Sequence, residues 1–199
     1  MILIGILGGV ASGKSAVSNR LGTLGAVVLD ADRLGHEVLR EADVKEELKR
    51  RWGERVFEAS GEVDRQRVAE IVFAAAPQGK KELAFLEQLT HPRIERRLRK
   101  QLADLDSGGV RAAVLDAPVM LKAGWDRMCD FLLFVDTPRQ VRLARARQRG
   151  WTEADFAARE AAQEPVEAKR SRASTILDNS SSWAHLYAQV DRFWRSLSE

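Results

Sequence analysis

The stretch GILGGVASGKSAVSNRL, residues 5–21, joins an apolar run to a segment with helical periodicity. The run that leads into it, residues 2–7, is short and continuous, as expected of a buried strand. Behind it, apolar residues recur at helical spacing from Ala16 to Leu24. The glycines, serines and Lys14 in between suit neither a strand interior nor a helix core. The fold can be inferred once the function of this polar, glycine-rich connection between strand and helix is understood.

Residues 8–15 match G-x-x-x-x-G-K-S, the pattern of a phosphate-binding loop. Glycines allow a tight turn whose backbone N–H groups surround an anion, and the next helix adds a partial positive charge. We expect Lys14 to reach the β- and γ-phosphates of ATP and the Ser15 hydroxyl to bind Mg²⁺. The residues expected to contact ATP here are Gly9, Val10, Ala11, Ser12, Gly13, Lys14, Ser15 and Ala16. The alternative, a turn without a ligand, is disfavoured by the strand before it and the helix after it.

Composition limits the class of protein. The chain has 199 residues, 45% hydrophobic and 31% charged, which indicates one soluble globular domain with a small insert. A net charge of +3 is too small to indicate nucleic-acid binding. The single cysteine, Cys129, excludes an internal disulfide and agrees with a cytoplasmic location. The N-terminal apolar run is far below the ~20 residues that span a membrane, so no membrane partner is expected.

Short apolar runs alternate with longer helical segments along the chain. The expected strands are residues 2–7, 26–29, 110–115, 131–135 and 175–177. The expected helices are residues 14–24, 32–51, 64–75, 79–104, 138–148, 153–172 and 183–197. This alternation predicts an α/β fold with a doubly wound parallel sheet.

Residues 55–105 interrupt the strand rhythm with helices alone, which predicts a helical insert. The sheet core is then expected from residues 1–54, 106–138 and 173–199. Residues 139–172 are expected to form a lid and a returning helix.

Acidic residues follow two of the expected strands. Asp30 and Asp32 come after the second strand, and Asp116 after the third. Ligands of open α/β sheets bind at the carboxyl ends of the strands. A carboxylate there can accept the proton of an attacking hydroxyl or bind Mg²⁺ through water. For Asp32 the alternative is a helix N-cap, and for Asp116 it is a loop aspartate held by backbone amides.

Arginines recur in the segment after the fourth strand. Four of them are three or four residues apart, so they would share one face of a helix. They are Arg139, Arg142, Arg145 and Arg149. We expect Arg145 and Arg149, just before the possible hinge Gly150, to close over the phosphates. A solvated ion-paired face is the expectation for Arg139 and Arg147, and Arg159 lies on the returning arm. Thr152 with Asp155 resembles a capping box.

The expected insert contains EQLTHPRIERRLRK, residues 87–100. Thr90 is a candidate N-cap, with Pro92 in the first helical turn. His91 is either a turn residue or a substrate contact. The basic side chains of residues 93–100 either face solvent or meet an anionic acceptor.

Several separated segments together resemble the dephospho-CoA kinase family. They are GGVASGKS at 8–15, DAD at 30–32 with His36, HP at 91–92, DAP at 116–118, QRG at 148–150, Arg159 with Gln163, and ILDNSSS at 176–182. The resemblance implies a P-loop kinase fold with a five-stranded parallel sheet, a helical CoA-binding insert and a lid. It implies ATP- and Mg²⁺-dependent phosphorylation of the 3′-hydroxyl of dephospho-CoA, the last step of coenzyme A synthesis.

The same resemblance assigns roles to individual residues. It makes Asp32 the base at the 3′-hydroxyl and places Asn179 and Ser180 near the adenine of ATP. The residues expected near the acceptor are Asp30, His36, His91, Asp116 and Arg159. Ser15, with Asp116 through water, is expected to hold Mg²⁺.

The sequence departs from the family pattern at three positions. Ala16 stands where the family has threonine, Lys122 where it has an acid, and Ser174 where it has aspartate. Two other functions stay open: a kinase of another small acceptor such as a nucleoside monophosphate, and a nucleotide-binding or RNA-associated regulator. A GTPase is excluded because the chain lacks N-K-x-D. A monomer is expected, and an oligomer stays open.

Overall fold

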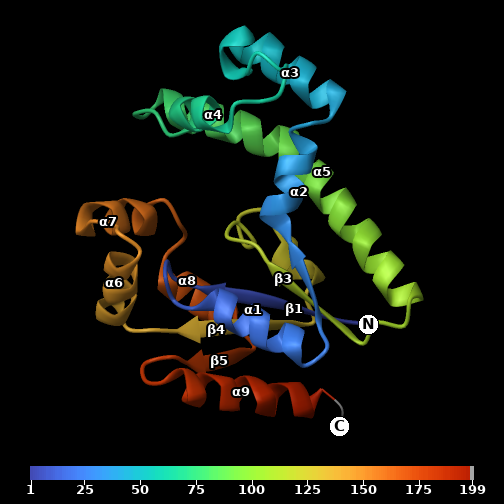
Figure 1. Cartoon of the computed structure of the whole chain (residues 1–199), viewed down its shortest axis with the longest axis vertical. Coiled ribbons are helices and arrows are strands. Elements are labelled where there is room, and N and C mark those ends of the chain that lie inside the picture. Colours follow the sequence, from blue (N-terminus) through green and yellow to red (C-terminus); the bar gives the residue numbers. More distant parts are fainter. Residues whose placement is uncertain (198–199) are drawn as a thin grey trace. The chain divides into compact units, whose positions relative to one another are not determined.

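The computed structural model describes residues 1–197 and contains a five-stranded sheet in which every pair of neighbouring strands is parallel (Figure 1). The strand order is β2-β3-β1-β4-β5. The strands are β1 (Ile2–Gly8), β2 (Val27–Asp30), β3 (Ala112–Asp116), β4 (Phe131–Asp136) and β5 (Thr175–Asp178). The predicted doubly wound α/β fold is confirmed, and each strand lies within two residues of its expected bounds.

The helices follow the expected segments closely. The α-helices are α1 (Lys14–Thr23), α2 (Ala31–Val38), α3 (Ala42–Trp52), α4 (Arg65–Val72), α5 (Gln78–Ser107), α6 (Arg139–Gln148), α7 (Glu153–Ala161), α8 (Val166–Arg172) and α9 (Trp183–Ser196). Two short 3₁₀ turns, η1 (Glu54–Val56) and η2 (Trp125–Met128), complete the set among residues 1–197. Each of the two long helices expected at 32–51 and 153–172 is divided into two; Pro165 immediately precedes the second part, α8.

The chain forms two compact units. The core unit comprises Met1–Asp30 and the chain from Leu102 onward, and the helical unit comprises Ala31–Gln101. The helices of residues 31–52, expected with the sheet, therefore belong with residues 55–101. Charged side chains of α5 pair with these helices, and Val44, Leu48 and Trp52 of α3 are buried.

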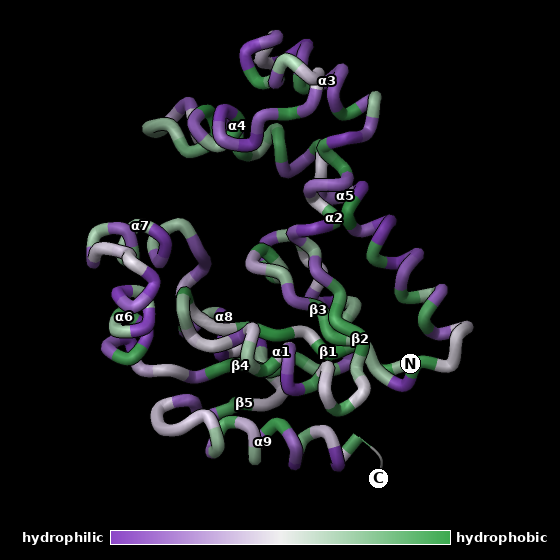
Figure 2. Tube along the Cα trace, in the orientation of Figure 1, coloured by the Kyte–Doolittle hydropathy of each residue, from purple (hydrophilic) through white to green (hydrophobic). Residues whose placement is uncertain are grey.

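In the core unit, α1 and α9 cover one face of the sheet, and α8 contacts the strands β1 and β4. A buried apolar cluster joins alternate residues of the strands to α1 and α9, among them Ile4, Val114, Val17 and Leu186. Figure 2 shows the hydrophobic character of the central strands. The packed sheet fixes the carboxyl end of β1, where the predicted phosphate loop begins, beside those of β3 and β4.

Gly5, in the middle of β1, leaves room for three neighbouring side chains. A Cβ at this position would lie 2.7 Å from Leu132 Cδ2, 2.8 Å from Met120 Sδ and 2.9 Å from Cys129 Sγ. Real Cβ atoms do not approach other atoms that closely, so the sheet face packs because residue 5 is glycine. Burial raises the pKa of the Cys129 thiol to about 12, in agreement with an apolar packing role.

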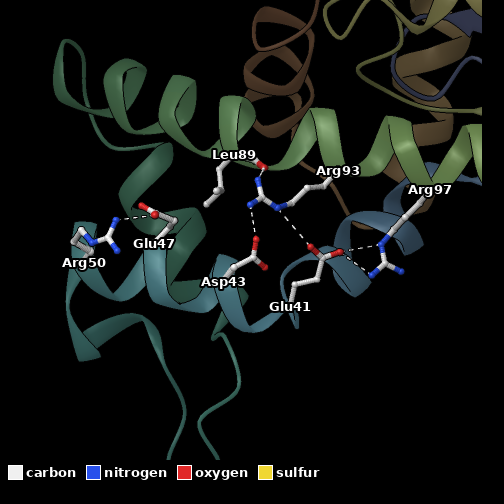
Figure 3. Close-up of polar contacts among 7 residues, drawn as sticks. All are labelled: Glu41, Asp43, Glu47, Arg50, Leu89, Arg93 and Arg97. Atoms are coloured by element: carbon white, nitrogen blue, oxygen red, sulfur yellow. Dashed lines mark hydrogen bonds and ion pairs between the residues drawn. The ribbon is translucent and has the colours of Figure 1, made fainter.

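In the helical unit, arginines of α5 are neutralised by acids near α2 and α3 (Figure 3). Arg93 Nη2 lies 2.6 Å from Asp43 Oδ2, and its Nε lies 3.5 Å from Glu41 Oε2. Arg97 donates to Glu41 Oε1 at 2.7 Å and to Glu37 Oε2 at 3.3 Å. These contacts connect helices that are far apart in the sequence, and they give two of the five basic side chains of residues 93–100 a structural role.

The prediction that Thr90 caps a new helix is wrong. Helix α5 runs without a break from Gln78 to Ser107, with Pro92 inside it. The Thr90 hydroxyl donates to Leu86 O at 2.8 Å, a bond typical of a threonine within a helix. Strong helix formers on both sides carry the helix through the proline, which removes a single backbone donor.

One other predicted cap is confirmed, and a further cap is found at the start of α9. Thr152 and Asp155 form a reciprocal capping box at the start of α7. Ser182 accepts a hydrogen bond from the amide of His185 at the start of α9. The latter fixes the loop that follows β5, which contains Asn179.

Replacing Gly5 with alanine tests the packing of the sheet face. We expect Gly5→Ala to lower the free energy of unfolding by about 1–3 kcal/mol, because the new methyl group overpacks the site. The matched control is Gly22→Ala in α1, whose Cβ would lie 3.5 Å from Val28 Cγ2, an ordinary contact. That change should raise stability by about 0.5–1 kcal/mol. Urea denaturation followed by tryptophan fluorescence measures both, and equal changes would contradict the packing argument.

Candidate functional site

The loop between β1 and α1 has the backbone conformation of an anion-binding turn. Gly13 is the N-cap of α1 at φ 101°, and Ala11 also has a positive φ of 58°. The amide of Ser12 donates to Gly9 O at 3.2 Å and closes the turn. The first amides of α1 have no acceptor within the helix, and no side chain caps them. The loop therefore presents several N–H groups to an anion.

The carbonyl oxygen of Ser12 is held by three donors from three different segments. Thr137 Oγ1, just beyond β4, donates at 2.8 Å. Asn179 Nδ2, just beyond β5, donates at 2.7 Å, and Arg145 Nη1 of α6 donates at 3.0 Å. Because a trans peptide directs its C=O and N–H to opposite sides, these bonds turn the Gly13 amide away from the donors. We call these three residues the Ser12 clamp.

The Ser12 clamp explains why residue 13 is glycine. A Cβ there would lie 2.7 Å from Asn179 Nδ2 and 3.3 Å from Arg145 Nη1. The two clamp residues also bind each other, since Arg145 Nη2 donates to Asn179 Oδ1 at 3.2 Å. The Arg145 guanidinium lies over the ring of Trp183, 4.4 Å from its centre, which restricts it further.

Arg142 supports the loop from within the protein. It is 5% exposed, and its Nε donates to Thr137 O at 3.1 Å. Its Nη1 donates to Val10 O at 3.4 Å and lies 2.6 Å from Glu160 Oε1 of α7. A Cβ on Gly9 would lie 2.8 Å from this Nη1, so the loop approaches the guanidinium closely only because residue 9 is glycine. Arg142 thus joins the phosphate loop to α7.

Lys14 lies at the start of α1, and its Nζ donates to Gly9 O at 3.2 Å. Burial lowers the pKa of Lys14; Asp116 opposes this change, and Arg142 and Arg149 add to it. Arg149 is exposed at the end of α6, directly before Gly150. An anion at the loop would be surrounded by several positive charges and by backbone amides.

Two predicted acidic residues face each other across the sheet edge. Asp30, the last residue of β2, pairs in register with Asp116, the last residue of β3. Ser18 Oγ of α1 donates to Asp116 Oδ2 at 3.1 Å, so Asp116 is directed toward the helix that begins at the phosphate loop. Asp32 lies in the first turn of α2, which begins at Ala31, so it is not the N-cap.

The remaining predicted residues of the core unit lie on α6, α7 and the loop after β5. The Ser180 amide donates to Asp178 Oδ1 at 2.9 Å. Arg159 lies over the ring of Trp151, 4.2 Å from its centre. As expected of a solvated face, Arg139 pairs with Glu160 at 2.9 Å and Arg147 with Glu153 at 3.0 Å.

His36 and His91 lie in the helical unit. The Arg65 guanidinium donates to the ring of His36, and both residues line a cavity of about 330 Å³. His91 is half-buried within α5 and is not a turn residue.

Three residues of the site have no assigned role from the sequence. Thr137 follows β4 directly, so the argument that identified Asp30 and Asp116 also applies to it. Arg142 belongs to the recognised arginine row, but only the fold shows that it is buried while Arg139 and Arg149 are exposed. Lys169 of α8 is 4% exposed, and no local pattern distinguishes it from its basic neighbours.

A comparison with protein families settles the classification. The family model described as dephospho-CoA kinase matches residues 2–185. The chain belongs to the dephospho-CoA kinase family. A dephospho-CoA kinase of Geobacter sulfurreducens is 36% identical, covering 98% of both chains. One of Symbiobacterium thermophilum is 37% identical, covering 98% of this chain and 81% of the relative.

Solved structures support the same fold. TT1252 from Thermus thermophilus matches with a TM-score of 0.82 at 34% identity, covering 98% of this chain and 97% of the other. A dephospho-CoA kinase from Campylobacter jejuni has a TM-score of 0.65 at 22% identity, covering 98% and 96%, which supports the fold alone. The chain is accordingly an ATP-dependent kinase with the predicted fold. Across the described part of this kinase, no helix has both the length and the apolar character needed to cross a membrane.

Replacing Thr137 with valine removes one donor of the Ser12 clamp without changing the side-chain shape. We expect Thr137→Val to weaken ATP binding about three- to tenfold, because the loop peptide is less firmly fixed. The free energy of unfolding should fall by about 1 kcal/mol.

Titration calorimetry measures the ATP affinity of this variant of the kinase. The matched control is Thr23→Val at the exposed end of α1, where the hydroxyl bonds its own helix at Arg20 O. Equal ATP affinities of Thr137→Val and Thr23→Val would contradict a role of the Ser12 clamp in nucleotide binding.

Proposed function

We infer that the protein transfers the γ-phosphoryl group of ATP to the 3′-hydroxyl of dephospho-CoA and releases CoA and ADP. One observation carries this inference, in a chain of this family: hydrogen bonds to the Ser12 carbonyl hold the loop of residues 9–16 in place. The loop leads into α1, whose first backbone amides are not capped by a side chain. Such a loop binds the phosphates of a nucleotide.

The residues of the loop suit a triphosphate. Within the chain described, the Ser12 hydroxyl oxygen is buried and has no hydrogen-bond partner. A phosphate oxygen would provide one, as it would for the amides of Gly13 and Lys14. Lys14 would exchange its weak carbonyl bonds for a phosphate oxygen. Asn179 and Ser180 are proposed to lie near the adenine, because Asn179 already contacts the loop.

The side chains present also suit Mg²⁺. Among residues 1–197, no group of three histidine, cysteine or acidic side chains could hold a metal ion alone. Mg²⁺ commonly takes one or two protein ligands and completes its shell with phosphates and water. Ser15 at the start of α1 and Asp116 are the proposed ligands, Asp116 through water. When bound, Mg²⁺ neutralises charge on the phosphates.

We propose Asp32 as the group that accepts the proton of the 3′-hydroxyl. It follows the carboxyl end of β2 by two residues, and its carboxylate is exposed. Asp30 and Asp116, which pair across the strands, are proposed to orient the acceptor. A carboxylate in this position acts as a general base in phosphoryl transfer.

The segment 139–172 is proposed to be the lid, with Arg145 and Arg149 at the phosphates. Arg145 is fixed by Ser12 and Asn179, so it would act from the loop side of the nucleotide. Arg149 is exposed before Gly150, whose φ of 79° favours glycine at a hinge. Both cations would stabilise charge that develops in the transition state.

The helical segment 55–105 is proposed to bind the acceptor together with His36 of α2. His36 beside Arg65 offers hydrogen-bond donors at a cavity, and His91 lies on the adjacent helix α5 of the same unit. Arg159 is proposed to approach the acceptor from the lid. A cytoplasmic location is proposed from the substrates and from the single cysteine.

The RNA-binding alternative loses part of its support. RNA would be bound by basic side chains such as those of residues 93–100, and of these Arg93 and Arg97 are paired with acids of their own unit (Figure 3). A kinase of another small acceptor is tested directly by ADP release with dephospho-CoA beside a panel of nucleoside monophosphates. Turnover with dephospho-CoA alone is expected, and turnover only with a monophosphate would contradict the proposal.

Replacing Asp32 with asparagine tests its role as the base. We expect Asp32→Asn to lower kcat about 10²–10⁴-fold, because the amide cannot accept the proton. ATP affinity should stay within about twofold of the original, since the phosphate loop is unchanged. Steady-state kinetics and calorimetry measure these quantities, with Asp104→Asn on the exposed side of α5 as the control. An equal loss of ATP affinity would assign Asp32 to metal binding instead.

A further inference from the structure

Lys169 is a buried lysine in the lid segment with no role in the mechanism above. It lies on α8 and is 4% exposed. Its Nζ donates to Gln163 Oε1 at 2.7 Å, a neutral acceptor. Burying an ammonium group costs folding free energy unless a charged partner compensates it. The position of Lys169 therefore requires an explanation.

The surroundings of Lys169 indicate a site for an anion. It lines a cavity of about 350 Å³ together with Gly9 and Val10 of the phosphate loop, Arg142 of α6 and Gln163 before α8. Glu160 and Glu164 also line this cavity, and Glu160 is paired with Arg142. The space therefore lies between the phosphate loop and the returning arm of the lid, within one compact unit.

Most of the influences around the cavity disfavour a charged Lys169. Its pKa is lowered to about 8, chiefly by burial; Lys14 and Arg142 act in the same direction, and Glu164 opposes them. Lys14 and Arg142 are thus close enough to repel the ammonium. An anion placed among these cations would relieve the repulsion and favour the protonated lysine.

We propose that Lys169 binds the transferred phosphoryl group, exchanging its bond to Gln163 for one to a γ-phosphate oxygen of ATP. This inference rests on the proposed function. In the transfer step, the acceptor oxygen forms a bond to the γ-phosphorus while the bond to the β,γ-bridging oxygen breaks. The bridging oxygen keeps the electron pair in ADP, and the hydroxyl proton goes to Asp32. Lys169 stays protonated throughout and stabilises the charge on the γ-oxygens.

The difference between the affinities for ATP and for ADP reports the contacts made by the γ-phosphate, and it can be measured without any acceptor. In calorimetric titrations at pH 7 with constant Mg²⁺, Lys169→Met should weaken ATP binding about ten- to hundredfold. Binding of ADP should change by less than about threefold, because ADP lacks the group that Lys169 binds. The matched control is Lys80→Met, an exposed lysine on α5, which should leave both affinities unchanged.

The dependence on pH gives a second readout. Because the lysine is half-deprotonated near pH 8, ATP binding there should take up about half a proton, and affinity should fall about tenfold from pH 7 to pH 9. Proton uptake is measured by titration in buffers of different ionisation enthalpy. Lys169→Arg, which stays charged, should reduce both effects, leaving only the contribution of Lys14, and keep part of the ATP affinity. The groups that face Lys169 are Lys14, Arg142, Glu160 and Glu164, and all remain in this variant.

The outcomes separate the two proposals. Equal losses of ATP and ADP affinity in Lys169→Met would make Lys169 a structural residue and overturn the inference. If Lys169→Met does not fold, Lys169→Arg decides: a pH dependence identical to that of the original protein overturns the inference. A protein that turns over no dephospho-CoA but shows the ATP-specific loss contradicts the proposed function and leaves the phosphate role of Lys169 supported.

Discussion

The carbonyl oxygen of Ser12 is the point on which the site depends. It accepts hydrogen bonds from Thr137, Asn179 and Arg145, which come from the end of β4, the end of β5 and helix α6. A phosphate loop is rich in glycine and flexible when isolated, so its conformation has to be imposed by neighbours. The three donors that impose it are all groups of the protein itself. The sheet order places β4 beside β1 and β5 beside β4, which brings the donors to the loop.

Helix α6 connects this clamp to the rest of residues 139–172. Arg145 reaches the loop at Ser12, and Arg142, one turn earlier, reaches Val10 and the carboxylate of Glu160 on α7. A change in the position of α7 would therefore act on the loop through Arg142. Lys169 completes this arrangement from α8, so three elements of the returning segment meet one short loop. Residues 139–172 are thus connected to the loop by hydrogen bonds, an ion pair and a shared cavity.

Much of this site could be predicted from the sequence because the signals are local. The glycines and Lys14 lie within eight consecutive residues, and the ends of β2 and β3 place Asp30 and Asp116 at one edge by the geometry of parallel strands. The capping box of Thr152 and Asp155 likewise involves residues that are close together in the sequence. Thr137 was accessible to the same reasoning, since it is the first residue after β4.

The errors concern interactions between residues distant in the sequence. Arg93 and Arg97 looked like a solvated or ligand-binding face, but they pair with acids about fifty residues earlier. Burial of Arg142 and Lys169 depends on the packing of α6, α7 and α8, which periodicity does not reveal. Thr90 beside Pro92 has the pattern of a helix start, and the helix continues because its flanking residues favour it. Local chemistry identified the loop, whereas tertiary packing selected the groups that hold it.

If the Ser12 clamp directs the amides of the phosphate loop toward the nucleotide, those amides should donate to phosphate when ATP binds. Amide chemical shifts of ¹⁵N-labelled protein, followed while Mg²⁺ and ATP are added, measure this. We expect Gly13, Lys14 and Ser15 to show the largest downfield changes. ATP binding that leaves these three amides unchanged and shifts residues elsewhere would contradict this role of the clamp.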